Sequence, residues 1–185
     1  MKKRLKWLLV GSLMCLVVGS VFHQGYGGGG KLEVIDLPDE TIFQIMTYLD
    51  PKDVVHFGAT CKGIHPFSQD KILWKQKAFE AGISKIELEK VKKGFFTYKQ
   101  LVIGYEYWKK FNEIKNSEDI ADEKKLTLLK DAAGQGSEAA ISNLLEVYEE
   151  GLFGLGKNNS EGLMLTKKYA DLGSEVAKCF LKRNK

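Results

Sequence analysis

The residues best suited to nucleophilic or metal chemistry are three cysteines and three histidines, and their spacing favours neither. Cys61 lies between His56 and His65, an arrangement from which a thiolate–imidazole pair could be built. Such a pair also needs a third group that orients the imidazole, and no residue is placed for that role. Structural histidines are therefore the simpler interpretation. Cys15 and Cys179 complete neither a zinc motif nor a disulfide framework, although a single Cys61–Cys179 bridge stays open.

Two further patterns could do chemistry but lack the companions that chemistry needs. Glu149-Glu150 is a carboxylate pair on an expected solvated face, where general acid–base work has no support. The run Gly27 to Gly30 does not follow a strand and lacks the Lys-Ser/Thr of a phosphate loop. With no metal cluster and no nucleophile elbow in the sequence, we expect no cofactor, no metal site and no enzyme activity.

Lysines and aromatic residues are interleaved between residues 81 and 120, a composition that could bind single-stranded nucleic acid. However, Leu101, Tyr105 and Trp108 fall at helical spacing, so an amphipathic helix with a solvated basic face explains them. Four of the 28 basic residues lie in the first six positions, and residues 1–30 contain no acidic residue. The rest of the chain is therefore neutral, and we expect no nucleic-acid partner.

The first 30 residues have the pattern of a secretory leader. A basic start precedes an uncharged apolar stretch at residues 7–22, and small residues at 18–20 suit a signal peptidase. The stretch is slightly shorter than the ~20 residues of a full membrane span, so a cleaved leader and an uncleaved anchor both stay open. The glycine run that follows is typical of a flexible linker, which puts the start of the fold near Lys31.

Between residues 35 and 80, the spacing predicts three short helices. Asp36 and Pro38 form a start signal, because a carboxylate can cap a helix and proline has no N–H to leave unsatisfied. Asp50-Pro51 repeats this signal for a second helix that ends at Gly58, and Pro66 limits a third. Three short helices make a thin core, yet the segment is rich in apolar residues, so we expect some apolar surface to face another protein.

The same segment resembles the F-box motif, including the spacing between its blocks. The resemblance is carried by Leu37-Pro38-Asp39-Glu40-Thr41-Ile42, Ile45, Leu49-Asp50-Pro51-Lys52-Asp53-Val54, Cys61-Lys62 and Leu73-Trp74. Val54, Gly58 and Ile64 depart from the family's usual residues, which could loosen the core.

This resemblance implies a trihelical fold that docks on the Skp adaptor of cullin-type ubiquitin ligases. On that basis Leu37 and Pro38 would form the leading segment pressed against the adaptor. The remaining hydrophobic contact would come from Ile42, Ile45, Leu49, Pro51 and Val54. In such contacts a few buried side chains dominate the affinity. The alternative, which stays open, is that the same residues fill the core of the helical unit.

An internal repeat occupies the C-terminal part of the chain. Three pairs of residues define it, each 37 positions apart: Ala133 and Ala170, Gly136 and Gly173, and Leu144 and Leu181. Small residues let helices approach closely, and the glycines can adopt left-handed caps. The pattern resembles tetratricopeptide-type repeats and, more narrowly, the Sel-like family, whose units stack and present surfaces to other proteins. A hairpin that only stabilises the chain is the alternative.

Together these patterns predict an all-α chain in four parts. They are a secretory leader or membrane anchor with a Gly-rich linker at 1–30, an F-box at 31–80, linker helices at 81–120 and Sel-like helical repeats at 121–185. We expect a protein-interaction adaptor whose F-box binds the Skp adaptor and whose C-terminal helices recruit an unknown target protein. Membrane contact is expected only through residues 7–22, if that stretch is uncleaved.

The leader and the F-box point to different compartments. The leader indicates export, whereas the Skp adaptor works in the cytosol. An exported bacterial mimic that acts in the cytosol of a eukaryotic host would reconcile the two, and Sel-like repeats are familiar in such bacteria. The alternative function is an exported or membrane-anchored helical-repeat scaffold with no ligase role.

Overall fold

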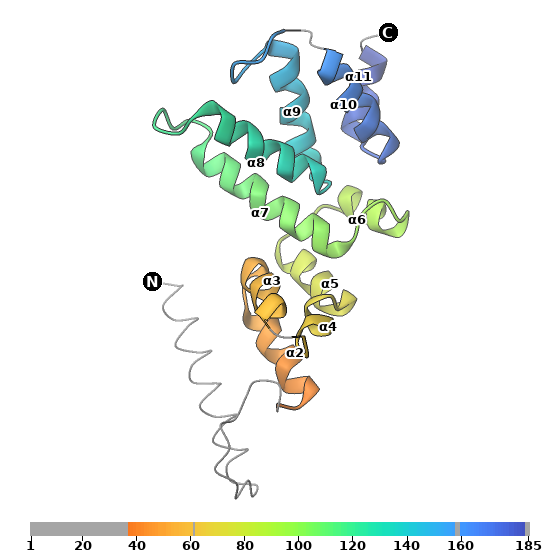
Figure 1. Cartoon of the computed structure of the whole chain (residues 1–185). Coiled ribbons are helices and arrows are strands. Elements are labelled where there is room, and N and C mark those ends of the chain that lie inside the picture. The colour runs from red at the N-terminus through yellow and green to blue at the C-terminus, as the bar shows by residue number, and fades with distance from the viewer. Residues whose placement is uncertain (1–36, 61, 158–159, 184–185) are drawn as a thin grey trace, which may run out of the picture. The chain divides into compact units, whose positions relative to one another are not determined.

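The computed structural model describes residues 37–60, 62–157 and 160–183, which form ten helices and no strand (Figure 1). The all-α prediction is therefore confirmed. The chain divides into two compact units between Leu73 and Trp74. The predicted leader at 1–30 lies outside the described residues, as do Asp36 and Cys61. Within the described ranges, none of the helices combines the length and apolarity that a membrane crossing needs.

The first unit consists of short helices around a small core. They are α2 (Asp39–Tyr48), α3 (Pro51–Thr60) and α4 (His65–Ser68), followed by the start of α5 (Lys71–Glu80). Each segment contributes one fully buried apolar side chain: Met46, Val54, Ile64 and Leu73. This is the trihelical core that the apolar spacing predicts, closed by the first turn of α5.

Two predicted helix limits in this unit are wrong, and packing explains both. Helix α3 does not end at Gly58 but continues to Thr60. A Cβ at position 58 would lie 2.1 Å from Ser68 Oγ, so glycine serves the close approach of α3 to the end of α4. Pro66 does not limit a helix but lies in the first turn of α4, where its missing N–H leaves no hydrogen bond unmade.

Side chains cap the helices that lead into the second unit. Asp70 Oδ1 accepts the backbone N–H groups of Ile72 at 2.7 Å and Leu73 at 2.9 Å, which starts α5. Helix α6 (Lys85–Lys92) begins with a reciprocal capping box between Ser84 and Glu87. Helix α7 (Tyr98–Ile114) begins with a second capping box, formed by Thr97 and Gln100. The sequence predicts linker helices in this part of the chain, one of them amphipathic, and the structure has α6 and the amphipathic α7 there.

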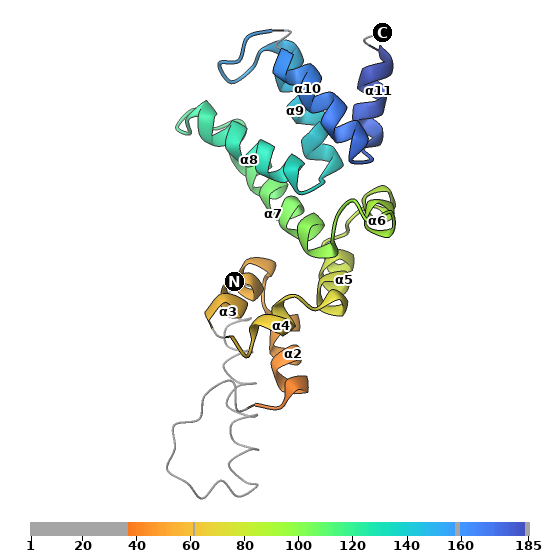
Figure 2. The ribbon, with the colours of Figure 1, turned by 45° about the vertical axis from the view of Figure 1, so that its right-hand side comes forward.

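The remaining helices form two successive hairpins that can be followed in Figures 1 and 2. They are α8 (Asp122–Gly134) with α9 (Glu138–Glu150), and α10 (Ser160–Asp171) with α11 (Glu175–Arg183). Both turns use a glycine in the left-handed region, Gly136 at φ 94° and Gly173 at φ 82°. In both, the next serine caps the second helix, since Ser137 Oγ and Ser174 Oγ each accept an N–H three residues on. The two hairpins that the 37-residue spacing relates therefore share the same turn geometry.

The hairpins share a deep apolar core with α7. Small residues at the helix crossings, Ala132, Ala133 and Ala140, are fully buried. Leu144 and Tyr148 of α9 fill the space beside them, and Phe111 of α7 joins the same cluster. Buried small residues bring the helix axes close, so large neighbours can interdigitate without leaving voids.

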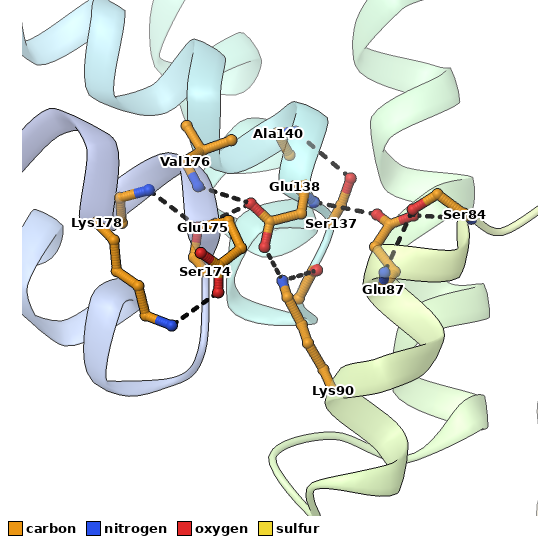
Figure 3. Close-up of polar contacts among 12 residues, drawn as sticks. Ser84, Glu87, Lys90, Ser137, Glu138, Ala140, Ser174, Glu175, Val176 and Lys178 are labelled. Atoms are coloured by element: carbon orange, nitrogen blue, oxygen red, sulfur yellow. Dashed lines mark hydrogen bonds and ion pairs between the residues drawn. The ribbon is translucent and has the colours of Figure 1, made fainter.

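A buried ion pair ties this unit together. Lys90 of α6 is 2% exposed and pairs with the carboxylate of Glu138 at the start of α9 (Figure 3). The same ammonium donates to the carbonyl oxygen of Gly136 at 2.9 Å. A charge so well removed from water is tolerated only when it is paired and hydrogen-bonded, and Lys90 meets both conditions.

Two carboxylates, those of Glu87 and Glu138, each connect their own helix to the start of a later helix (Figure 3). Glu87 Oε1 of α6 accepts the backbone N–H of Glu138 at 3.1 Å, which caps α9. Glu138 Oε2 in turn accepts from Ser174 Oγ at 2.8 Å and from the Val176 N–H at 3.4 Å, at the start of α11. Each carboxylate thus satisfies donors at the N-terminus of another helix, where the helix dipole also favours negative charge.

Candidate functional site

The leading segment of the F-box resemblance begins helix α2. Pro38 is the N-cap residue of α2, with φ −55° and ψ 144°, and not its first helical residue as the sequence predicts. Its carbonyl oxygen accepts the N–H groups of Thr41 at 2.9 Å and Ile42 at 3.1 Å. Asp39 and Glu40 occupy the first turn, where they complement the helix dipole. The Pro38 ring itself is exposed, so it is available to a partner.

Four of the seven predicted contact residues are buried inside the first unit. They are Leu37, Ile42, Ile45 and Val54, all less than a tenth exposed. A side chain already covered by its own chain has little surface left to bury against a partner. These four therefore act first as core, which is the alternative that the sequence analysis leaves open, and any effect on binding would come through the shape of the unit.

The other three predicted residues keep accessible surface. Pro38 is exposed, whereas Leu49 and Pro51 are half-buried at the junction of α2 and α3. Leu49 has extended backbone, with φ −74° and ψ 149°, and its N–H donates to the Met46 carbonyl at 3.3 Å. This short extended stretch carries the chain from the end of α2 directly into α3.

The same junction contains a side chain that the sequence analysis did not single out. Tyr48 is 58% exposed, although it is a large aromatic residue. The signal was in the spacing: Tyr48 follows Gln44 by four residues and Glu40 by eight, so it continues the polar face of α2. We name Tyr48, Leu49 and Pro51 the α2–α3 corner. An aromatic residue with a polar tip is a frequent anchor at protein interfaces.

The residues considered for nucleophilic, metal or acid–base chemistry lie on different helices. His56 and His65 are both exposed, and so is Cys179 on α11. Glu149 is also exposed and pairs with Arg183 at 2.5 Å. Among the described residues, no group of three or more His, Cys, Asp or Glu side chains could hold a metal ion. The Cys61–Cys179 bridge lies outside what the structure describes.

Comparison with known proteins identifies the segment that contains α2 to α5. Residues 34–80 match the family model described as F-box-like. This segment is an F-box-like domain. The match spans α2 to α5 and supports the resemblance that the sequence analysis draws from Leu37 to Trp74. No curated protein and no solved structure matches the chain.

The F-box-like domain gives the chain a coarse function. F-box domains generally bind Skp-type adaptors, so the domain points to a protein-interaction adaptor in a ubiquitin-ligase context. Together with the all-helical fold, it points to a non-catalytic role. The membership of the C-terminal hairpins in the Sel-like family stays a prediction.

Proposed function

We propose that the F-box-like domain docks on the Skp adaptor of a cullin-type ubiquitin ligase through Pro38 and the α2–α3 corner. The observation that supports this most directly is the exposure of Tyr48 beside Leu49 and Pro51, in a domain matched by the F-box-like family model. An apolar corner between the end of α2 and the start of α3 offers a partner a few anchor side chains, and such anchors supply most of the affinity of an interface.

The C-terminal unit would present the recruited target. It consists of repeated hairpins with a continuous core, an architecture that other proteins use to offer extended surfaces. On this account one chain joins ligase and target without any active site. The target itself is a protein of unknown identity.

We further propose that the chain is exported by its leader and acts in the cytosol of a eukaryotic host. Support comes from the basic start and the apolar stretch at residues 7–22, together with the cytosolic role that an F-box implies. Mass spectrometry of the native N-terminus tests the export step. A mature start near residue 20 to 30 is expected, whereas an intact residue 1 would instead indicate an anchor.

Adaptor binding is tested with the full chain and a purified eukaryotic Skp adaptor in a quantitative titration. Tyr48→Ser combined with Pro38→Ser should weaken binding by about 10- to 100-fold, since anchor residues each contribute more than ~1 kcal/mol. Both side chains are exposed, so the variant should keep the thermal unfolding temperature of wild type.

A control variant and the wild-type chain complete this titration. Met164→Ser in the C-terminal unit is a matched control, because it also removes an exposed large apolar side chain but lies far along the chain from the corner. It should bind the adaptor as wild type does. A folded wild-type chain that does not bind the adaptor would contradict the proposal and favour the helical-repeat scaffold.

A further inference from the structure

The outer face of α10 exposes two large apolar side chains next to each other. Leu163 is 51% exposed and Met164 is 64% exposed. On the opposite side of the helix, Gly162, Thr166 and Tyr169 are buried. A Cβ at position 162 would lie 2.9 Å from Tyr148 Cβ, which shows how closely that side packs on α9. The exposed pair is therefore on the solvent side of a well-seated helix.

The internal repeat shows that this exposure is specific to the second hairpin. Leu126, the equivalent of Leu163 in α8, is 9% exposed and belongs to the buried cluster around Leu144. Thr127, the equivalent of Met164, is exposed but polar. One hairpin thus covers its leucine and places a threonine in water, whereas the other leaves both positions apolar and uncovered. Exposed large apolar residues that lie together make a candidate interaction site, whereas single ones are common on protein surfaces.

The charges beside this pair differ between the hairpins in the same way. Lys130 and Asp131 of α8 correspond to Lys167 and Lys168 of α10. Lys167 and Lys168 are exposed, and neither forms an ion pair with any residue in the part of the chain that the structure describes. The face defined by Leu163, Met164, Lys167 and Lys168, which we name the α10 face, is therefore apolar with a flank on which two lysines outnumber one carboxylate, that of Asp171.

Glu161, the acidic residue near the start of the α10 face, already has partners within the chain. Glu161 Oε1 accepts a hydrogen bond from Tyr148 Oη at 2.8 Å and lies 3.5 Å from Lys130 Nζ. In a symmetric dimer through this face each copy would bring two lysines and one carboxylate, Asp171, so like charges would remain opposed and self-association is disfavoured. An anionic membrane is a poorer match as well, because surface-binding helices carry a broader apolar face than two side chains.

We propose that the α10 face binds an amphipathic helical segment of a partner protein that carries apolar anchors flanked by carboxylates. The partner's apolar side chains would cover Leu163 and Met164, and its carboxylates would neutralise Lys167 and Lys168. This inference rests on the proposed function in one respect only, since it identifies the α10 face as the place where a recruited target is held. Helix recognition by a small apolar patch with complementary charge is a common binding mode.

The test uses the full chain and a designed probe. The probe is a fluorescein-labelled helical peptide of about 15 residues, with leucines spaced four and seven positions apart and glutamates beside them. The control peptide has lysine in place of each glutamate. Fluorescence anisotropy should show that wild type prefers the glutamate peptide by about tenfold, because two exposed charge pairs are gained with one peptide and opposed with the other.

Two double variants separate the apolar and the charged contributions. Lys167→Glu with Lys168→Glu should reverse the preference between the peptides, and Leu163→Ser with Met164→Ser should weaken binding of both. Lys124→Glu is the matched control: it changes an exposed lysine of α8 and should leave the preference intact. All four replaced residues of α10 are exposed, so circular dichroism should show unchanged folding.

Several outcomes would overturn the proposal. One is no saturable binding of the glutamate peptide by wild type, and another is equal affinity for the two peptides. A dimer in sedimentation that is lost in Leu163→Ser with Met164→Ser would point to a second copy, and loss of binding to phosphatidylserine vesicles in that variant would point to a membrane. The titration with the Skp adaptor tests the proposed function independently of this inference. The α10 variants should bind the adaptor as wild type does, even if the peptide experiment contradicts the inference.

Discussion

The F-box-like unit and the C-terminal unit bury their apolar side chains in different ways. In the first, helices of ten residues or fewer surround a core with few fully buried large side chains, and Tyr48 remains exposed at a helix junction. In the second, a continuous cluster from Phe111 to Ala177 is reinforced by the buried Lys90–Glu138 pair. The second unit thus combines a continuous core and a buried ion pair with exposed apolar side chains on α10, whereas the first unit has a small core beside the exposed α2–α3 corner.

The largest expected effect comes from the buried ion pair that distinguishes the second unit. Lys90→Ala would leave the Glu138 carboxylate without its ammonium partner in a site that is largely closed to water. Breaking such a pair costs about 3–5 kcal/mol of unfolding free energy. Urea unfolding followed by tryptophan fluorescence measures it, since Trp108 lies in this unit.

Lys92→Ala provides the control for that measurement. Lys92 lies two residues away on the same helix and pairs with Glu89 in an exposed position. Its removal should leave the unfolding free energy nearly unchanged. Equal effects of the two substitutions would show that burial of the Lys90 pair contributes nothing to the second unit.

The repeat itself offers the next test, because it supplies two equivalent leucines in different surroundings. Leu144→Ala removes a fully buried side chain and should cost about 2–5 kcal/mol, including the cavity left behind. Leu181→Ala, 37 residues on, removes a half-buried side chain and should cost less than half as much. Chemical denaturation of the two variants measures both, and equal costs would contradict a core centred on the first hairpin.

A smaller effect is expected where the first unit packs most closely. Gly58→Ala would place a Cβ 2.1 Å from Ser68 Oγ, so α3 and α4 must separate, at about 1–3 kcal/mol. Hydrogen exchange of the α2–α4 amides should report this loss without an equal change in α8–α11. Adding Ser68→Gly should restore protection, because it removes the side chain that the new methyl group meets.

The second unit contains a contrasting glycine. At Gly134, at the end of α8, a Cβ would meet nothing within 4 Å. Gly134→Ala should therefore stabilise by about 0.5–1 kcal/mol, since alanine loses less backbone entropy on folding. If both glycine substitutions destabilised equally, close packing at Gly58 would not be the reason for the first result.

The smallest expected effect appears only at alkaline pH. Burial raises the pKa of the Tyr169 phenol above its ordinary value near 10. The folded state therefore holds this proton more tightly than the unfolded state. Its contribution to stability is fully present below the unfolded pKa and is lost as pH rises through the folded pKa. Tyr169→Phe should flatten the fall in stability above about pH 10, which chemical denaturation over a pH series measures.

Sequence patterns predict the helices of both units and the repeat well, because caps and apolar spacing are local signals. The turns at Gly136 and Gly173 follow from two positions that recur 37 residues apart. The limits at Gly58 and Pro66 are wrong for a different reason. The contact between Gly58 and Ser68 forms only when α3 and α4 come together, and no local signal records it.

The candidate site is predicted less completely than the fold. Apolar residues at helical spacing predict that Ile42, Ile45 and Val54 share the inner faces of short helices, but the same spacing fits a core and an interface. Only the packed structure separates buried Val54 from accessible Leu49. The buried Lys90–Glu138 pair joins residues 48 positions apart, and two ordinary charged residues in the sequence give no sign that they will meet.

We expect the F-box-like domain, and not the C-terminal hairpins, to carry the surface for the ligase adaptor. Hydrogen–deuterium exchange of the full chain, with and without the purified Skp adaptor, tests it most directly. Adaptor binding should add protection in α2, the α2–α3 corner and α3, and leave α8–α11 unchanged. Protection confined to α8–α11, or none in a folded chain at saturating adaptor, would contradict it.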